Sequence, residues 1–318
     1  MINKNQEIEY HIYLTGRLGN QLFQYAIAKS LQKTYGGNII LNTYEFDKYG
    51  PLWEKKHGKF KYDMGNFVVN QNVKLESVPL PWYADFRNPL TRVIKKMFPR
   101  ILFKFGAKKG LLLWQRDDYI EIPQISGCGK VIVNGWWQDI RYFKNVEEEL
   151  KEDIKPITAP NRDNQDLYRI IQDDESVCVS IRAGNYLLDG IREQFYVCNP
   201  EYFIESVRAL NSIINSPVYI VFSDDLEWVK SNINFEKYFP NTRFYYESGK
   251  DTVEEKIRLM SSCKHFIISN STFSWWAQFL SKNNKKRVVA PENWYADGRK
   301  CGLYLNDWIL VKGLINNE

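Results

Sequence analysis

The stretch SNSTFSWWAQFL, Ser269 to Leu280, follows a short apolar run and opens an amphipathic helix. Its apolar positions recur at i, i+3, i+4 and i+7, so one helix face is predicted to pack against a sheet. These positions are Phe273, Trp276, Ala277 and Leu280. The polar residues at the helix start are Ser269, Asn270, Ser271 and Thr272. Because a helix start carries free N–H groups, this layout is typical of a phosphate-binding turn, with a well-capped core helix as the alternative.

The same strand-then-helix order runs through the C-terminal half of the chain. Short β-rich runs predict strands over residues 177–181, 218–222, 243–246, 265–268 and 287–290. Helical patterns fill the gaps over residues 200–213, 226–233, 252–263 and 272–281. Asp251 followed by Glu254 predicts the cap of the third helix. This alternation predicts a Rossmann-like α/β domain with a parallel sheet, in which ligands bind beyond the carboxyl ends of the strands.

The N-terminal half begins with a second βαβ unit. It comprises a strand over residues 10–14, the turn TGRLGN, a helix over 21–35 and a strand over 38–41. The pattern then dissolves into aromatic, proline-containing and basic segments, so we interpret residues 48–130 as an insertion. A strand over 131–134 and a helix near 139–154 restore it. With 318 residues, 44% of them apolar, the chain is predicted to form two domains, residues 1–160 and 161–318, with a linker at 155–166.

Composition restricts the class of function. The formal net charge is +5, and the segment 91–116 alone holds eight Lys or Arg residues and no acid. A nucleic-acid-binding protein more often spreads such charge over a folded face, so this class is disfavoured. Five cysteines form no CxxC pair and three histidines show no metal-ligand spacing, which predicts a reduced, cytoplasmic, metal-free protein. No apolar run approaches the roughly 18 residues of a membrane span, so neither membrane insertion nor secretion is expected.

Polar residues follow three predicted strands of the C-terminal half. They are Arg182, Gly184 and Asn185 after the first strand, Ser223, Asp224 and Asp225 after the second, and Ser269, Asn270, Ser271 and Thr272 after the fourth. An arginine fork binds a diphosphate, aspartates accept hydrogen bonds from a ribose or base, and a helix start cradles phosphate oxygens. The sequence therefore predicts a nucleotide-diphosphate site. The alternatives are helix capping by Asp224 and Asp225 and a buried ion pair of Arg182.

The turn after the first strand of the chain does not fit a dehydrogenase. Gly16 and Gly19 flank two residues rather than spelling GxGxxG. Asn20 is predicted to cap the following helix and to place its amide beside a ligand, with a purely structural turn as the alternative. The buried stripe of this helix is predicted to be Leu22, Phe23, Ala26, Ile27 and Leu31.

A second N-terminal motif, NGWWQDIRYF (134–143), follows the strand predicted over 131–134. The aromatic faces of Trp136 and Trp137, flanked by the amide of Gln138, suit the C–H surfaces of a sugar. A role in the core or in a domain interface is the alternative for the two tryptophans.

Taken together, these motifs resemble the bacterial-type alpha-1,2-fucosyltransferases of glycosyltransferase family 11. The motifs are GRLGNQLFQYA, NGWWQDIRYF, SIRAGNY, FSDDLEWVK, ISNSTFSWWAQFL and APENWY. Their order and spacing match over most of the chain outside residues 48–130. The resemblance implies a GT-B fold of two facing Rossmann-like domains, an acceptor-side N-terminal one and a donor-binding C-terminal one. It also implies inverting transfer of fucose from GDP-fucose to a galactose 2-hydroxyl, with no cofactor and no metal.

For such a transfer, we hypothesise roles for individual residues. Arg182 and the helix start at Ser271 would stabilise the leaving diphosphate, with Gly19 on the donor side. Asn20 would position the acceptor or the phosphate from the N-terminal domain. The general base stays open between Asp189 and Glu193, the acids nearest the arginine loop.

The arginine loop departs from the family pattern. The family typically reads His-x-Arg-Arg-Gly-Asp-Tyr, whereas this chain reads SIRAGNY over residues 180–186. The first arginine, the glycine and the tyrosine match. One alternative is therefore a family relative with a different nucleotide sugar or acceptor, and another is a catalytically silent sugar-nucleotide or glycan-binding protein.

The basic segment 91–116 interleaves its cations with apolar residues, and Pro99 would break a single helix there. The apolar members are Val93, Ile94, Met97, Phe98, Ile101, Leu102, Phe103 and Phe105. We hypothesise a peripheral contact with the inner face of the membrane, which would bring the enzyme to a lipid-linked, galactose-containing glycan in surface-polysaccharide synthesis. A solvated or acceptor-facing segment is the alternative.

Overall fold

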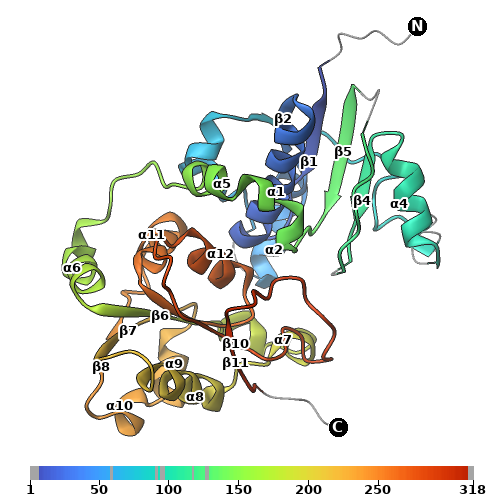
Figure 1. Cartoon of the computed structure of the whole chain (residues 1–318). Helices are drawn as coiled ribbons and strands as arrows, with labels where there is room; N and C mark the ends of the chain where they lie inside the picture. Colours follow the sequence, from blue (N-terminus) through green and yellow to red (C-terminus); the bar gives the residue numbers. More distant parts are fainter. Residues whose placement is uncertain are drawn as a thin grey trace, which may run out of the picture. The chain divides into compact units, whose positions relative to one another are not determined.

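The computed structural model describes residues 7–57, 60–89, 92–93, 97–116, 118–125 and 129–313. The chain divides into two compact units, Met1–Lys155 and Pro156–Glu318, each built on its own parallel sheet (Figure 1). Sequence analysis had placed this division at residue 160. Among the described residues, no helix combines the length and the apolar character needed to cross a bilayer.

The N-terminal unit contains a five-stranded parallel sheet in the order β3-β2-β1-β5-β4. Its strands are β1 (Glu9–Tyr13), β2 (Asn38–Asn42), β3 (Lys74–Glu76), β4 (Leu111–Trp114) and β5 (Lys130–Gly135). Its helices are α1 (Leu18–Tyr35), α2 (Tyr44–His57), α4 (Pro99–Ala107) and α5 (Glu147–Asp153), with 3-10 turns η1 (Met64–Asn66), η2 (Val68–Gln71), η3 (Ile140–Tyr142) and η4 (Lys144–Val146). The predicted stripe of α1 is confirmed, because all five of its residues are at most 4% exposed.

The segment interpreted as an insertion contributes both edge strands of this sheet. β3 pairs with β2, and β4 pairs with β5. Strands of three and four residues are too short for an alternating pattern to identify them. The helix predicted near 139–154 is also shorter than expected, since η3 and η4 precede α5.

The C-terminal unit contains a six-stranded parallel sheet in the order β11-β10-β9-β6-β7-β8. Its strands are β6 (Glu175–Ile181), β7 (Pro217–Ser223), β8 (Arg243–Tyr246), β9 (His265–Ile268), β10 (Val288–Pro291) and β11 (Ile309–Val311). Its helices are α6 (Gln165–Asp173), α7 (Arg192–Phe195), α8 (Pro200–Asn211), α9 (Leu226–Asn232), α10 (Phe235–Tyr238), α11 (Val253–Ser262) and α12 (Thr272–Leu280), with 3-10 turns η5 (Arg162–Asn164) and η6 (Gly184–Leu187). All five predicted strands are present, and β11 is additional.

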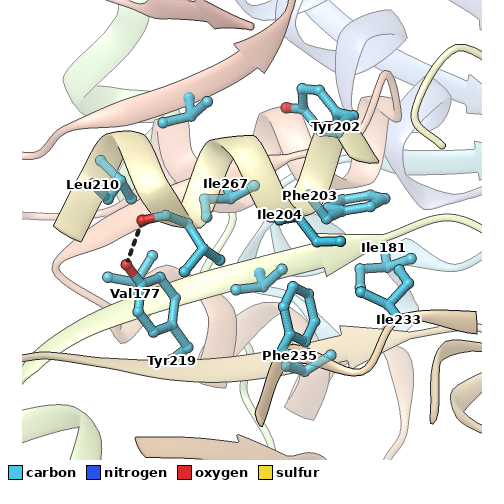
Figure 2. Close-up of a cluster of buried hydrophobic side chains, with 14 of the residues drawn as sticks. Val177, Ile181, Tyr202, Phe203, Ile204, Leu210, Tyr219, Ile233, Phe235 and Ile267 are labelled. Carbon is cyan, nitrogen blue, oxygen red and sulfur yellow. Dashed lines mark hydrogen bonds between the residues drawn. The ribbon is translucent and has the colours of Figure 1, made fainter. Parts of the chain in front are cut away.

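The core of the C-terminal unit forms where α8 packs on β6 and β7 (Figure 2). Phe203 and Leu210 of α8 are fully buried with Val177 and Tyr219 of the two strands. The Tyr219 hydroxyl donates a hydrogen bond of 3.3 Å to the Val207 carbonyl oxygen, so its polar end is satisfied inside the core. This packing fixes the two strands that carry the first two predicted site segments.

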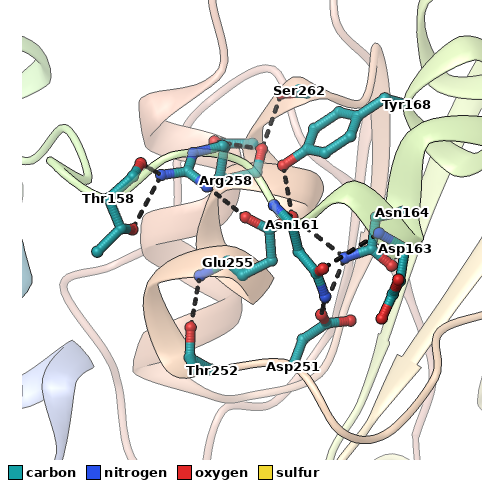
Figure 3. A network of polar contacts seen from close by, with 11 residues as sticks. Thr158, Asn161, Asp163, Asn164, Tyr168, Asp251, Thr252, Glu255, Arg258 and Ser262 are labelled. Carbon is teal, nitrogen blue, oxygen red and sulfur yellow. Dashed lines mark hydrogen bonds and ion pairs between the residues drawn. The ribbon is translucent and has the colours of Figure 1, made fainter.

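The start of α11 differs from the prediction. Its N-cap is Thr252, whose side chain accepts from the Glu255 N–H, and not Asp251. Asp251 instead accepts hydrogen bonds of 2.9 Å from the side-chain amides of Asn161 and Asn164 (Figure 3). The Asp251 carboxylate therefore binds the segment that leads into α6. A contact over this distance in sequence cannot be predicted from local residue spacing.

Glu255 is the centre of this polar network and is 3% exposed. Its Oε1 atom accepts from the Asn161 N–H at 3.0 Å, the Asn164 amide at 3.1 Å and the Tyr168 hydroxyl at 2.9 Å. Its other oxygen pairs with Arg258, which also donates to Thr158 (Figure 3). One buried carboxylate therefore ties the start of the C-terminal unit to α11.

We expect Glu255→Ala to lower the free energy of unfolding by about 3 kcal/mol, because Tyr168, Asn164 and Arg258 each lose a buried acceptor. Urea denaturation of the full chain measures this. Glu205, an exposed partner of Arg208 on α8, is the matched control, since Glu205→Ala should change stability by less than about 1 kcal/mol. Equal losses for the two variants would show that the network does not hold the unit together.

Candidate functional site

The strand order of the C-terminal sheet reverses between β6 and β9. In open α/β sheets the loops that follow the two strands at such a point leave a crevice, where ligands bind. Here the loop after β6 carries Arg182, and the turn after β9 carries Ser269 to Thr272. Two of the three predicted segments therefore flank the switch point, and the third, after β7, borders the first.

Arg182 is held in place by an ion pair. Its Nη1 atom lies 2.9 Å from Oδ2 of Asp224, and its guanidinium lies 5.5 Å from the ring centroid of Tyr186. The Asp224 Oδ1 atom accepts a 2.9 Å hydrogen bond from the Ala183 N–H. The Arg182 side chain remains 24% exposed. The guanidinium is therefore oriented by Asp224 while part of it is accessible to a ligand.

Gly184 makes room for this arrangement. A Cβ atom at this position would lie 2.4 Å from Oδ2 of Asp224, closer than two such atoms approach. Position 184 is therefore glycine because any larger residue would clash with the Asp224 carboxylate. Asn185 follows in η6, and its side chain lies outside the described residues.

Asp225 and Ser223 have structural roles after β7. Asp225 caps α9 by accepting from the Trp228 N–H at 2.9 Å, as the alternative interpretation held. The Ser223 hydroxyl accepts from the Asp225 N–H at 3.0 Å and is buried. Of the two aspartates, only Asp224 contacts the arginine loop, so the predicted pair divides into one cap and one orienting carboxylate.

The turn between β9 and α12 is built by its buried residues. Asn270 is 2% exposed, and its side-chain amide donates to the carbonyl oxygens of Phe195 at 2.9 Å and Trp294 at 2.8 Å. Ser269 is fully buried, with its hydroxyl 3.3 Å from that of Ser274. Ser269 and Asn270 therefore shape the turn from inside.

Ser271 and Thr272, in contrast, are half-buried at the beginning of α12. Ser271 is the N-cap residue, and its side chain makes no capping hydrogen bond. The first N–H groups of a helix carry partial positive charge and suit an anion. This is the part of the turn that is placed to meet a phosphate.

Aromatic rings connect the two sides of the switch point. The Tyr186 ring stacks on Phe195 with centroids 5.5 Å apart, and Phe195 lies edge-on to Tyr295 at 5.8 Å. The Tyr186 hydroxyl donates to the Asn270 carbonyl oxygen at 3.1 Å. Burial raises the pKa of Tyr186 to about 12, so this donor keeps its proton at neutral pH. The APENWY motif, which holds Trp294 and Tyr295, therefore supports the turn.

Glu247 was missed by the sequence analysis. It directly follows β8, is 4% exposed, accepts from the Ser223 N–H at 2.9 Å and pairs with Lys256 at 2.9 Å. Burial raises the pKa of Glu247 above its usual range, against the opposing effect of Lys256. The rule that identified the other segments, a polar residue directly after a predicted strand, would have found it.

The two general-base candidates lie after the arginine loop. Asp189 is in the turn that follows η6, and Glu193 is on α7; both are exposed. Among the described residues, no hydrogen bond or ion pair joins either of them to Arg182 or Asp224, so position alone does not choose between them. In the part of the chain that the structure describes, no group of three His, Cys, Asp or Glu residues has the arrangement of a metal site.

The N-terminal sheet has its own switch point, between β1 and β5. Gln138, after β5, donates a 3.0 Å hydrogen bond to Oδ1 of Asn20, after β1. α1 begins at Leu18 with Arg17 as the N-cap, so Asn20 lies in the first turn and does not cap the helix as predicted. Gly19, in the same turn, is buried. Two separately predicted motifs thus meet here.

Buried glutamines of the GRLGNQLFQYA motif hold this turn, a role that the apolar pattern did not predict. Gln21 donates to the Gly16 carbonyl oxygen at 3.0 Å and accepts from the Asp63 N–H at 2.9 Å. Gln24 accepts from the Thr15 N–H at 3.0 Å and donates to the Gly135 carbonyl oxygen at 3.2 Å, which links the ends of β1 and β5. In the sequence, the sign of this role is a glutamine among the apolar residues of the predicted helix.

Trp137 belongs to the core, which was the alternative interpretation. It is 1% exposed, adopts a φ of 56°, and packs edge-on against Tyr142 at 5.2 Å. Its ring therefore offers no surface to a sugar, contrary to the acceptor-side prediction. Trp136 and Gln138 are half-buried, and both retain accessible surface at this switch point.

Comparisons with known proteins agree with this architecture. The alpha-1,6-fucosyltransferase NodZ, crystallised with GDP, superposes with a TM-score of 0.52 at 14% identity, over 87% of this chain and 93% of that one. At this identity the likeness concerns the fold alone. Together with the two parallel sheets, it confirms the predicted α/β fold of the GT-B class.

Related sequences cover nearly the whole chain. An alpha-1,2-colitosyltransferase of Escherichia coli is 32% identical over 89% of this chain and 91% of its own length. The O-antigen biosynthesis glycosyltransferase WbnK of the same species is 27% identical over 93% and 98%. Human galactoside alpha-(1,2)-fucosyltransferase 1 is 21% identical over 85% and 65%. The model of glycosyl transferase family 11 matches residues 9–312, and the chain therefore belongs to this glycosyltransferase family.

Proposed function

We propose that this glycosyltransferase moves fucose from GDP-fucose to the 2-hydroxyl of a galactose residue on a glycan, with inversion and without a metal, during synthesis of a surface polysaccharide. The observation that carries the proposal is the half-exposed Arg182, oriented by Asp224 at the switch point of the C-terminal sheet. The name of WbnK supports the polysaccharide setting. The names of the galactoside fucosyltransferases support the acceptor and the linkage.

The chemistry follows from where charge develops. The acceptor oxygen bonds to C1 of fucose while the bond from C1 to the diphosphate oxygen breaks, so negative charge grows on GDP. Arg182 and the partial positive charge at the start of α12 stabilise that charge. The acceptor proton passes to Asp189 or Glu193. Asn20, hydrogen-bonded to Gln138, positions the acceptor hydroxyl.

A second donor has its own support. The relative at 32% identity is a colitosyltransferase, whereas the human fucosyltransferase is 21% identical. Colitose differs from fucose by lacking the 3-hydroxyl, so both sugars present the same diphosphate to Arg182. The departures at Ser180, Ala183 and Asn185 lie in the arginine loop. The alternative proposal is therefore transfer of colitose by the same mechanism.

We expect Arg182→Ala to reduce transfer at least about a hundredfold, because the leaving diphosphate loses its charged donor. The transfer rate of Arg182→Lys should lie between those of Arg182→Ala and the wild type, since lysine keeps the charge and lacks the planar fork. Initial rates with GDP-fucose and a galactoside measure this. Arg243→Ala is the matched control, because Arg243 pairs with Asp174 at 2.6 Å at the opposite end of the sheet. Near-normal turnover of Arg182→Ala would contradict the proposed role.

The two base candidates are separated by Asp189→Asn and Glu193→Gln. The true base should lose at least about a hundredfold in kcat and lose the acidic limb of the pH–rate profile, while GDP binding is unchanged. The other variant should stay within a few-fold of wild type. Normal profiles for both variants would exclude both carboxylates.

Donor choice is tested by calorimetry with GDP-fucose, GDP-mannose, UDP-galactose and the GDP ester of colitose, followed by transfer assays. We expect GDP-fucose to bind more tightly than GDP-mannose and UDP-galactose, and to be turned over equally well with and without EDTA. Turnover only with the colitose donor would select the alternative. Binding of a donor without turnover on any galactoside would indicate a silent sugar-nucleotide-binding protein.

A further inference from the structure

The N-terminal unit contains a cavity of about 750 Å³ whose lining includes residues of α4 and β4. α4 lies beside β4, the edge strand of the sheet (Figure 1). This volume lies within the range of small-molecule sites, roughly 300–1,000 Å³. The proposed function does not use the cavity. Its walls are mainly apolar and include Leu102, Phe103, Phe105 and Leu113.

Cations line the cavity as well. Arg92, Lys109 and Arg116 are lining residues, and none of the described residues that line the cavity is acidic. Arg116 pairs with Asp118 at 3.2 Å, whereas Arg92 and Lys109 have no ion pair within the described residues. The cavity thus combines an apolar interior with unneutralised positive charge.

α4 presents apolar side chains on both of its faces. Phe103 and Ala107 are buried, and the Phe103 ring lies edge-on to Trp114 at 5.5 Å. On the outer side, Ile101 is 55% exposed and Phe105 is 65% exposed, one helical turn apart. The helix therefore has an apolar face that no described residue of its own unit covers.

We call the exposed apolar side chains of residues 82–105, those of α4 included, the apolar patch. Eight of the sixteen large apolar side chains that are exposed in the described part of the chain lie between Trp82 and Phe105. The eight are Trp82, Tyr83, Val93, Met97, Phe98, Ile101, Leu102 and Phe105. A large apolar patch marks an interaction site, and one mixed with Lys and Arg matches an anionic bilayer surface.

We propose that the cavity binds one chain of an anionic phospholipid, with Arg92 and Lys109 on its phosphate, and that the apolar patch docks the enzyme on an anionic membrane. A ligand with an apolar chain next to a phosphate matches this lining, because the chain packs on the apolar walls and the phosphate pairs with the cations. Ile101 and Phe105 enter the interfacial region beside it. Lys95 and Lys96, also counted in the membrane hypothesis, lie outside the described residues, and the proposal does not use them.

Sedimentation of the full chain with vesicles tests the docking. We expect binding to vesicles of phosphatidylcholine and phosphatidylglycerol in equal parts, weak binding to phosphatidylcholine alone, and release by salt. Arg92→Glu with Lys109→Glu should weaken the binding more than about tenfold. Ile101→Ser with Phe105→Ser should weaken it similarly. Equal partitioning of the wild type into both vesicle types would overturn the proposal.

Matched controls lie in the C-terminal unit. Lys237→Glu with Lys250→Glu reverses two exposed lysines, and Ile213→Ser removes an apolar side chain that is 53% exposed. These variants should bind like wild type, and a loss equal to that of the patch variants would overturn the proposal. Arg182→Ala should also bind vesicles normally, so the vesicle experiment tests membrane docking independently of the proposed transfer reaction.

Photocrosslinking tests the cavity itself on the unaltered protein. A phosphatidylglycerol with a diazirine near the end of one acyl chain, mixed into the same vesicles, should label peptides that contain Leu102 to Gly106 or Leu111 to Leu113. Labelling that avoids both segments would overturn the assignment of the cavity.

Discussion

The ion pair between Arg182 and Asp224 is the interaction on which the candidate site depends. One carboxylate oxygen of Asp224 pairs with the Arg182 guanidinium, and the other accepts from the Ala183 N–H. Asp224 therefore fixes both the loop and the Arg182 side chain. The same carboxylate requires glycine at position 184. Because Arg182 is oriented before any ligand arrives, little rearrangement is needed when charge develops on a leaving diphosphate. The hydrogen bond from the Tyr186 hydroxyl to the Asn270 carbonyl oxygen then joins this loop to the α12 side of the switch point.

Much of this architecture was predictable because it is local. The strand-then-helix alternation predicted every strand from β6 to β10, and the polar segments after β6, β7 and β9 lie at one edge of the sheet, as expected. The failures came from long-range contacts. Asp251 was expected to cap α11 but accepts from Asn161 and Asn164, about ninety residues away in sequence. β3 and β4 are short edge strands that form by pairing with β2 and β5. Their own sequences are too short to show a strand periodicity.

The sequence motifs of both units contain two kinds of polar residue. Ser269, Asn270, Gln21 and Gln24 are buried and hold turns together, whereas Arg182, Ser271, Thr272 and Asn20 remain half-exposed at the switch points. A sequence motif does not separate these kinds, because a buried amide and a ligand-binding amide look the same in a string of letters. Burial decides between them. The double tryptophan illustrates the point, since Trp137 is core and Trp136 keeps an accessible surface.

A crystal structure of the protein with GDP and a galactoside acceptor tests the central claim most directly. The account predicts that the diphosphate contacts the Arg182 guanidinium and the N–H groups at the start of α12, with the Arg182–Asp224 pair unchanged. A diphosphate bound elsewhere, or an Arg182 that stays on Asp224 without touching the nucleotide, would contradict the account. It would reduce the ion pair to a structural contact.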